Sequence, residues 1–396
     1  MIVVGGTYSE YCYHPEWDQV FGSGGRGAAT LTRLGAKDVV LTTCTPKAAR
    51  RTVEATLSPF GVEIDAAESD SLYEFIYTHP LSEPYLKPFP VHSVRHKKTI
   101  RSDVALVYGM LEGLPRVSAK RIVFDPQSET DAAKPLDFID QAKEIALVLN
   151  EKELADFSGE TNVALGATKI LSNKGVKVVV VKRGAYGATV FEGKNRDEIP
   201  VFPSSSVFKI GSGDVFSAAF SKFWGLDEQS PQAAAERASR CASIYCNTRS
   251  LDQVAYFNEI DSLPLKNRKR PTIYLAGPFF SLGQRIMVEE ARRSLLSLGA
   301  NVFSPLHDVG TEDSPEVIAR EDLRGLRKSD VVLALISDLD PGTIFEIGFA
   351  RSRKIPVVAY GEGIQSHHLT MLIGSECICS EDFCSALYNS IWAGLK

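Results

Sequence analysis

Short apolar runs of strand length alternate with helix-length stretches along the whole chain, and this alternation limits the folds open to it. In the first part of the chain, strands are expected at Ile2–Val4, Val39–Thr42, Ala105–Tyr108, Ile122–Phe124, Ile145–Leu149 and Val176–Val181. Helices are expected at Ala28–Leu34, Lys152–Phe157, Asn162–Ser172, Val215–Trp224 and Ala233–Tyr245. This rhythm predicts a mainly parallel sheet with helices on both faces. Between Thr78 and Arg101 closely spaced prolines interrupt it, so a long loop or lid is expected there.

The last third of the chain repeats the pattern on a smaller scale. Strands are expected at Ile273–Ala276, Val302–Phe303, Val331–Ile336 and Val357–Tyr360, and helices at Gln284–Leu298, Glu316–Lys328 and Thr343–Ser352. Such connections give a compact doubly wound parallel sheet whose ligands bind beyond the carboxyl ends of the strands. The basic, proline-flanked stretch 263–271 is the expected linker, so the sequence predicts one domain over 1–262 and a second over 272–396.

Composition excludes several classes of protein. The 44% hydrophobic content is ordinary for a globular chain, and no apolar run approaches the roughly 18 residues that cross a bilayer. The net charge of −5 and the lack of a basic face argue against nucleic acid as a partner. The N-terminus reads as a strand rather than a signal peptide, and the seven cysteines have no framework spacing. We therefore expect a cytoplasmic protein with reduced thiols and small-molecule substrates.

Acidic residues gather around the third strand of the smaller domain. Asp330 precedes this strand, Asp340 follows it, and Glu346 comes six residues later, after Gly342 and Thr343, which suit a turn entering a helix. In the first turn of that helix the carboxylate of Glu346 would be favoured in the ionised form that a nucleophile needs. A carboxylate can trap an oxocarbenium-like anomeric carbon, while a second acid protonates the departing base. Helix-capping and surface acids are the alternative interpretation of each residue taken alone.

Four segments of this domain resemble, in order and spacing, the nucleoside 2-deoxyribosyltransferase family: Tyr274–Phe280, Phe303–Pro305, Lys328–Val332 and Gly342–Ala350. The resemblance implies that Glu346 attacks the anomeric carbon, and that Asp330 and Asp340 hold the sugar and assist the base. It also places Tyr274 and Gly277 in the pocket, with Phe279 or Phe280 stacked on the base and Gly342 and Thr343 at the substrate. No cofactor is expected here. Because neighbouring subunits complete the pocket in this family, a homo-oligomer is expected. Whether water or a second base is the acceptor remains open.

A glycine-rich turn marks the larger domain. Gly211-Ser212-Gly213-Asp214 opens an expected helix, where unpaired amide groups can bind a phosphate. An aspartate in the first turn can accept the proton of a hydroxyl that attacks the γ-phosphate. A capped helix after a turn is the alternative interpretation.

Further segments of the larger domain resemble the ribokinase-like (PfkB) carbohydrate kinases: Phe21–Ala28, Phe124–Pro126, Asn150 with Glu153, and Val181–Gly187. The resemblance implies Asp214 as catalytic base and Gly211, Ser212 and Gly213 as the anion hole. Asn150 and Glu153 would organise Mg²⁺ and the phosphates, Glu153 acting on the metal indirectly, and Gly184 would lie near the nucleotide. ATP and Mg²⁺ are the implied cofactors. The fold expected for the whole chain is α/β, a ribokinase-like parallel-sheet sandwich followed by a flavodoxin/Rossmann-like doubly wound domain.

The larger domain departs from the family pattern at three places. Arg26 stands where an asparagine is usual, and Phe208-Lys209-Ile210 replaces an Asp-Thr-Thr wall. The segment Tyr8–Trp17 is short and aromatic, without a clear sugar-binding aspartate. The leading hypothesis is a bifunctional enzyme of nucleoside or nucleotide metabolism, with a kinase and an N-glycosidic activity. The alternatives are a nucleotide- or NAD-cleaving N-glycosidase with a degenerate kinase domain, and a non-catalytic nucleotide sensor.

Overall fold

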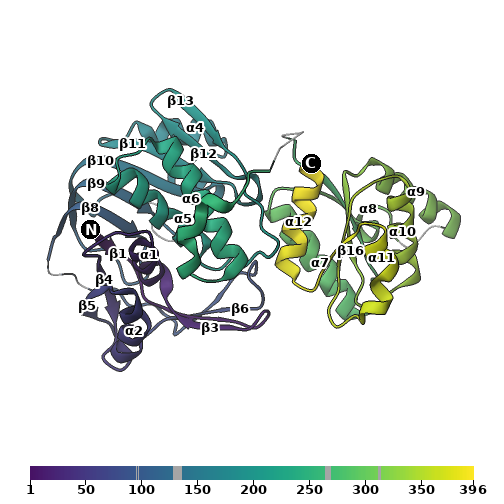
Figure 1. Ribbon diagram of the computed structural model, residues 1–396, viewed down its shortest axis with the longest axis horizontal. Helices are drawn as coiled ribbons and strands as arrows, with labels where there is room; N and C mark the ends of the chain where they lie inside the picture. The colour runs from purple at the N-terminus through teal and green to yellow at the C-terminus, as the bar shows by residue number, and fades with distance from the viewer. Residues whose placement is uncertain (95, 97, 128–135, 264–268, 311–313) are drawn as a thin grey trace. The chain divides into compact units, whose positions relative to one another are not determined.

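A computed structural model describes residues 1–94, 96, 98–127, 136–263, 269–310 and 314–396 (Figure 1). The chain forms two compact units, which we call the N-terminal unit (Met1–Ser204 with Phe208–Ser262) and the C-terminal unit (Ser205–Val207 with Leu263–Lys396). Residues 264–268 of the expected linker, including Lys266 and Arg268, lie outside the described residues. No helix in the described ranges is long and apolar enough to cross a membrane.

The N-terminal unit is built on a nine-stranded sheet with the order β13-β12-β11-β10-β9-β8-β1-β4-β5. Its parallel strands are β1 (Ile2–Val4), β4 (Val40–Thr45), β5 (Glu63–Glu68), β8 (Ile100–Tyr108), β9 (Val117–Asp125), β10 (Ile139–Asn150) and β11 (Val176–Lys182). The edge strands β12 (Ala188–Glu192) and β13 (Asn195–Ile199) run antiparallel. All six strands expected in this part of the chain are present, with β8, β9 and β10 longer than the sequence predicted.

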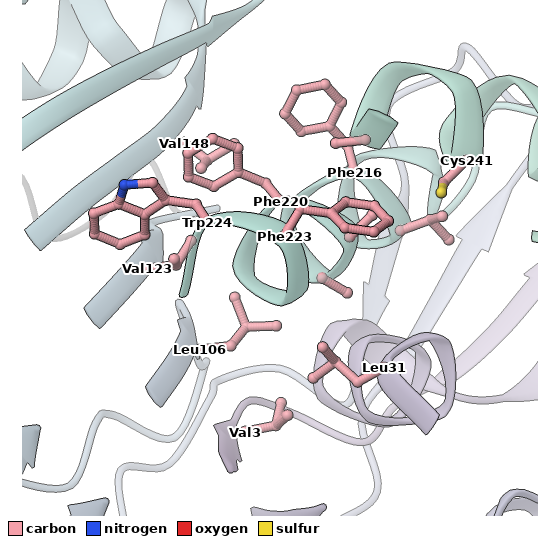
Figure 2. Close-up of a cluster of buried hydrophobic side chains, with 14 of the residues drawn as sticks. Val3, Leu31, Leu106, Val123, Val148, Phe216, Phe220, Phe223, Trp224 and Cys241 are labelled. Carbon is pink, nitrogen blue, oxygen red and sulfur yellow. The ribbon is translucent and has the colours of Figure 1, made fainter. Parts of the chain in front are cut away.

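Side chains alternate between two cores, one on each face of this sheet, as the period of two in a strand requires. One core contains Val3, Leu106 and Val148 and packs against α1 (Gly22–Arg33), α5 (Ser212–Phe220) and α6 (Pro231–Thr248), as Figure 2 shows. The other core contains Val4, Val107 and Leu149 and packs against α3 (Glu151–Ser158) and α4 (Val163–Leu171). Helix α2 (Arg50–Leu57) follows β4. Helices therefore cover both faces, as the β–α rhythm predicted.

A second, four-stranded sheet was not foreseen from the sequence. It has the order β3-β2-β6-β7, with β2 (Ser9–Cys12), β3 (Trp17–Val20), β6 (Glu74–Tyr77) and β7 (Tyr85–Lys87). The aromatic segment after the first strand thus forms a hairpin, and the proline-rich stretch expected to be a loop contributes a short strand. We call this small sheet the lid sheet. Cys12 on β2 packs with Phe208 and Ile210. The apolar residues that stand in place of the Asp-Thr-Thr wall therefore contact the lid sheet.

The C-terminal unit is a five-stranded sheet with the order β15-β14-β16-β17-β18, all parallel. The strands are β14 (Thr272–Ala276), β15 (Asn301–Phe303), β16 (Val331–Leu335), β17 (Val357–Tyr360) and β18 (Ile378–Ser380). The helices are α7 (Leu282–Ser297), α8 (Pro305–Asp308), α9 (Pro315–Lys328), α10 (Pro341–Ser352), α11 (Thr370–Gly374) and α12 (Phe383–Leu395). In chain order the strands run 2-1-3-4-5, which is the flavodoxin-like doubly wound arrangement. The expected fold class is confirmed for both units.

Candidate active sites

The topology of the C-terminal unit predicts where its site lies. The strand order reverses between β14 and β16, and ligands of such sheets bind beyond the carboxyl ends of the strands at this point. Tyr274 lies on β14, and Glu346 lies on α10, the helix that follows β16. The Tyr274 hydroxyl donates a short hydrogen bond to Oε1 of Glu346. Two of the predicted site residues therefore meet at the switch point.

Glu346 lies in the second turn of α10, not in the first as the sequence suggested. Asp340 is the N-cap of this helix and Pro341 its first residue, so the first turn carries no acid. Burial raises the pKa of Glu346 to about 7, and the charges of Asp322 and Asp340 raise it as well. The hydrogen bond from Tyr274 acts in the opposite direction and lowers it. Glu346 is thus a partly buried carboxyl group that titrates near neutrality, as perturbed groups at functional sites do.

Asp322, on α9, is a member of this cluster that was not predicted from the sequence. Its charge raises the pKa of both Glu346 and Tyr274, which places it beside them. Burial raises the pKa of Asp322 itself to about 6. Its Oδ1 atom is buried and has no hydrogen-bond partner within the described part of the chain. An unpaired buried carboxyl oxygen at a switch point is suited to a ligand group. The sequence contained one indication of this position. Asp322 lies four residues before the fully buried Leu326, and residues four apart share a face of a helix.

Asp340, Gly342 and Thr343 form the entry to α10. The Oδ2 atom of Asp340 accepts hydrogen bonds from the backbone N–H of Thr343 at 2.8 Å and from its hydroxyl at 3.1 Å. Thr343 is buried, while Gly342 is exposed. These contacts fix the start of the helix and with it the direction of Glu346.

Asp330 does not join the other acids. Its Oδ2 accepts a hydrogen bond from the backbone N–H of Thr272 at 2.7 Å, and its own N–H donates to the Thr272 carbonyl at 2.8 Å. Both contacts lie at the amino ends of β14 and β16, whereas Glu346 follows the carboxyl end of β16. Since parallel strands point the same way, a residue just before the strand lies at the edge opposite the site. The contacts of Asp330 therefore join the start of β14 to the start of β16.

The remaining predicted pocket residues lie in the loop after β14 and are Gly277, Phe279 and Phe280. Phe279 and Phe280 have ring centroids 5.3 Å apart, and Phe280 is 76% exposed. The loop is held by Gln284, whose Oε1 accepts from the backbone of Phe280 and Ser281 and whose amide donates to Asp338 at 2.8 Å. A Cβ on Gly277 would lie 3.0 Å from Leu335, so a larger residue would press on β16.

An aromatic pair packs in the core beside Glu346. The ring of Phe303, on β15, stacks on that of Tyr274 with centroids 5.5 Å apart. A Cβ on Gly325 of α9 would come within 2.3 Å of the Phe303 ring. Gly325 is therefore the residue that lets α9 approach closely enough to bring Asp322 to Tyr274 and Glu346.

In the N-terminal unit, the predicted glycine-rich turn opens α5. Gly211 is the N-cap with φ of 78°, a value that favours glycine, and Asp214 is the acid of the first turn. Lys209 Nζ donates to the Ser212 hydroxyl at 2.9 Å, and a Cβ on Gly213 would lie 3.5 Å from Lys182 Nζ. The turn is thus bordered by cationic side chains, which suits an anion.

Asp214 is already paired. Its Oδ2 accepts from Arg26 Nη1 at 2.7 Å, and its Oδ1 accepts a short hydrogen bond from Gln127 Nε2. The Tyr108 hydroxyl donates to its backbone carbonyl at 2.6 Å. Arg26, noted from the sequence as a departure from the family pattern, therefore contacts the predicted catalytic base directly.

A second buried ion pair lies at the carboxyl edge of the large sheet. Lys182 Nζ donates to Asp125 Oδ2 at 2.8 Å, and the Ser217 hydroxyl donates to the same oxygen at 2.5 Å. Burial by itself lowers the pKa of Lys182, but the charges of Asp125, Glu153 and Asp214 raise it above its usual value. Lys182 therefore stays cationic among three acids, next to the glycine-rich turn. Lys182 is not among the site residues predicted from the sequence.

Asn150 and Glu153 have a local structural role. Asn150 Oδ1 accepts from the backbone N–H of Glu153 at 2.8 Å, and Glu153 Oε2 accepts from the backbone N–H of Asn150 at 2.7 Å. This reciprocal pair is a capping box at the start of α3. Gly184 has φ of 54° in the turn after β11. Within the described residues, no three His, Cys, Asp or Glu side chains cluster in a way that could hold a metal ion.

Comparison with known proteins agrees with both resemblances. Residues 273–386 match the nucleoside 2-deoxyribosyltransferase family, and residues 117–254 match the pfkB family of carbohydrate kinases. A cytidine kinase of Thermococcus kodakarensis is 31% identical over 116 residues, which are 28% of this chain. The match spans only 41% of that relative's length.

Solved structures resemble about two thirds of the chain. A putative ribokinase II from E. coli, in its apo form, has a TM-score of 0.50 and 16% identity and covers 65% of this chain and 98% of its own. A ribokinase from Thermotoga maritima has a TM-score of 0.48 and 19% identity, covering 66% and 95%. At 16% identity the likeness to the E. coli structure concerns the fold alone.

Proposed function

We propose, for a chain that joins a pfkB-type carbohydrate kinase segment to a nucleoside 2-deoxyribosyltransferase segment, that the C-terminal unit cleaves or exchanges the N-glycosidic bond of a nucleoside or nucleotide. Glu346 is the proposed nucleophile. The observation that carries this proposal is the convergence of Glu346, Tyr274 and Asp322 at the switch point of the sheet, with a Glu346 pKa of about 7.

The proposed reaction has two steps. A carboxylate oxygen of Glu346 attacks the anomeric carbon, the carbon–nitrogen bond breaks, and its electron pair passes to the base, which takes a proton. The product is a sugar ester of Glu346 and a free base. A second base, or water, then attacks the same carbon, loses a proton and releases the carboxylate. The two steps are the same in kind, so one site serves both.

Asp322 is the proposed proton donor in the first step. Burial raises its pKa to about 6, so near neutral pH it holds a proton more often than an ordinary aspartic acid does. Its Oδ1 is buried and has no hydrogen-bond partner within the described residues, and we assign it to the departing base. Asp340 fixes the start of α10, and we assign it to a sugar hydroxyl. Asp330 has no part in this mechanism, because its carboxylate binds the Thr272 backbone at the other edge of the sheet.

Tyr274 positions the nucleophile. Its hydroxyl occupies Oε1 of Glu346, which leaves the second oxygen to face the sugar. Phe279 and Phe280, of which Phe280 is 76% exposed, offer apolar surface in the loop after β14 on which a base can stack.

The loop after β14 favours nucleosides over 5′-monophosphates. A helix N-terminus binds phosphate through unpaired amide groups. At α7, Ser281 and Gln284 form a capping box, so the amides of Phe280, Ser281 and Gln284 already have side-chain acceptors. Arg285 Nε donates to the Phe279 carbonyl at 2.9 Å, which turns it toward the loop.

Base release measures this function directly. Nucleosides, nucleoside monophosphates and NAD are incubated with the protein, with and without a second base, and free base and exchanged nucleoside are quantified. The proposal expects base release from nucleosides, increased exchange when a second base is present, and less product from the monophosphates. No free base from any compound would contradict it.

A second activity is proposed for the N-terminal unit, namely transfer of phosphate from ATP to a hydroxyl of a sugar or nucleoside. It is supported by Asp214 in the first turn of α5, beside Gly211, Ser212 and Gly213. Mg²⁺ and the phosphates would be organised by the α3 capping box of Asn150 and Glu153, with Gly184 near the nucleotide. Formation of ADP in the presence of an acceptor tests it. Base release without ADP would favour an N-glycosidase with a degenerate kinase domain, and nucleotide binding without either product would favour a sensor.

A further inference from the structure

Arg26 lies at the centre of a buried chain of ionic contacts that links three parts of the N-terminal unit. Its Nη1 donates to Oε1 of Glu10 at 3.0 Å and to Oδ2 of Asp214 at 2.7 Å, and its Nη2 makes a short bond to Oε2 of Glu10. The Arg26 side chain is 1% exposed, that of Glu10 7% and that of Asp214 11%. Glu10 comes from β2 of the lid sheet, Arg26 from α1 and Asp214 from α5.

The guanidinium lies against the glycine-rich turn. A Cβ on Gly211 would come within 2.2 Å of Arg26 Nε and within 2.5 Å of Nη1. The rings of Phe21 and Tyr245 lie 5.6 Å and 5.9 Å from the guanidinium carbon. Arg26 Nε is buried without a hydrogen-bond partner among the residues that the structure describes. The side chain thus fills the space between the lid sheet and the start of α5.

Both oxygens of the proposed base are occupied in this arrangement. Arg26 binds Oδ2 of Asp214 and Gln127 binds Oδ1. A substrate hydroxyl that gives its proton to Asp214 has to stand within hydrogen-bond distance of one of these oxygens. Breaking a buried ion pair is costly because each charge loses its partner without regaining water. The Asp214 side chain is only 11% exposed, with Arg26 against Oδ2 and Gln127 against Oδ1, so a hydroxyl that approaches either oxygen has to displace one of these side chains.

We propose that Arg26 is a built-in occupant of the acceptor subsite of the N-terminal unit and that, through Glu10, it holds the lid sheet closed over that subsite. The assignment of an acceptor subsite rests on the proposed kinase role of Asp214, whereas the closing contact rests on the geometry alone. The unit is then closed without a ligand, and an acceptor enters only when Arg26 leaves Asp214.

Cys12 reports whether the lid sheet is closed. It lies on β2, two residues after Glu10, and is fully buried against Phe208 and Ile210. Cys241 is equally buried but belongs to the main core, so it reports unfolding of the whole unit. Reaction of the native full-length protein with N-ethylmaleimide, followed over time by peptide mass spectrometry, gives a separate labelling rate for each thiol.

The Arg26→Asn variant should label Cys12 at least tenfold faster than the unmodified protein does, with the Cys241 rate unchanged. Arg33→Asn is the matched control, because Arg33 lies on the same helix but pairs with Asp252 at the surface. It should leave both rates as they are. Rapid labelling of Cys12 in the unmodified protein would overturn the proposal.

Fast labelling of Cys241 would show that the Arg26→Asn substitution unfolds the unit. In that case a second variant, Glu10→Gln, tests the proposal. Glu10→Gln removes the charge on the lid side only and leaves Arg26 paired with Asp214. It should speed Cys12 labelling severalfold with Cys241 protected, and an unchanged Cys12 rate in this variant refutes the closing role. Labelling needs no phosphate transfer, so absence of ADP formation would count against the kinase activity and leave this result unaffected.

Discussion

The hydroxyl of Tyr274 donates a hydrogen bond to Oε1 of Glu346, joining the first strand of the C-terminal unit to the helix that carries the proposed nucleophile. Burial raises the pKa of Glu346 to about 7, and this bond lowers it. The reaction needs the ionised carboxylate of Glu346 and a proton on Asp322, so kcat/KM should pass through a maximum, rising with pH as Glu346 ionises and falling as Asp322 loses its proton. Changes to the two neighbours, Tyr274 and Asp322, should move that rise in opposite directions.

Tyr274→Phe should move the rise in kcat/KM to higher pH. The variant loses the hydrogen bond that stabilises the carboxylate, so ionisation of Glu346 becomes harder. We also expect a loss in kcat on the order of 10², as for the removal of one donor to a reacting charge. A pH–rate profile of base release checks both effects, and Tyr388→Phe, on α12 of the same unit, is the control. An unshifted profile in Tyr274→Phe would separate the tyrosine from the nucleophile.

Asp322→Asn should move the same rise to lower pH while reducing turnover. Removing a negative charge makes ionisation of Glu346 easier, and the proposed proton donor is lost. Turnover should fall by about 10²–10⁴, the usual contribution of a general acid. Asp330→Asn is the matched comparison and should retain nearly full activity, because its amide oxygen can still accept from the Thr272 N–H. If Asp330→Asn lowered turnover more than Asp322→Asn did, Asp330 would belong to the site and Asp322 would not.

Gly325→Ala tests the close approach of α9 to the sheet. Its Cβ would come within 2.3 Å of the Phe303 ring, so the ring or the helix has to shift. Overpacking of this kind costs about 1–3 kcal/mol, more than the roughly 1 kcal/mol that alanine gains over glycine in a helix. We expect a lower free energy of unfolding in urea and slower base release. Gly283→Ala on α7, with nothing within 4 Å of the new Cβ, should be neutral or slightly stabilising. Equal behaviour of the two variants would show that the contact with Phe303 is unimportant.

Asp214→Asn tests the kinase activity of the N-terminal unit. The variant should lose ADP formation by several orders of magnitude yet still bind nucleotide, because the turn binds phosphate through backbone amides. ADP release and nucleotide affinity are measured on the same preparation. Undiminished ADP production in the variant would exclude Asp214 as the base.

Much of the fold could be predicted because strands buried on both faces leave a strong signal. The runs 178–181, all valine, and Val331–Ile336 are apolar runs of this kind, and the structure contains strands at both. The lid sheet gave no such signal, since β3 and β7 are short and mostly exposed and β7 lies among prolines. Their pairing depends on contacts with β2 and β6, which are not visible in the local sequence.

The candidate sites were harder to predict, because sequence spacing does not show which end of a strand a residue occupies or what its side chain already binds. Asp330 and Asp340 flank β16 and look alike in the sequence, but only Asp340 lies at the carboxyl end. Asp322 was missed because it lies in the middle of an expected helix, away from the strand ends and turns that mark sites in the sequence. Arg26 was visible as an unusual residue, but its pairing with Asp214, 188 positions away, required the tertiary structure.

The role of Glu346 is tested most directly by base release from nucleosides in the Glu346→Gln variant. Glutamine keeps the size of the side chain and can still accept the Tyr274 hydrogen bond, but it cannot form the ester with the sugar. Glu376→Gln, which changes an exposed glutamate paired with Arg351 in the same unit, is the control and should keep full activity. Nucleophile removal typically costs several orders of magnitude in kcat. We predict a loss of at least about 10³-fold in base release and exchange with substrate binding retained. Turnover near that of the unmodified protein would contradict the proposed mechanism.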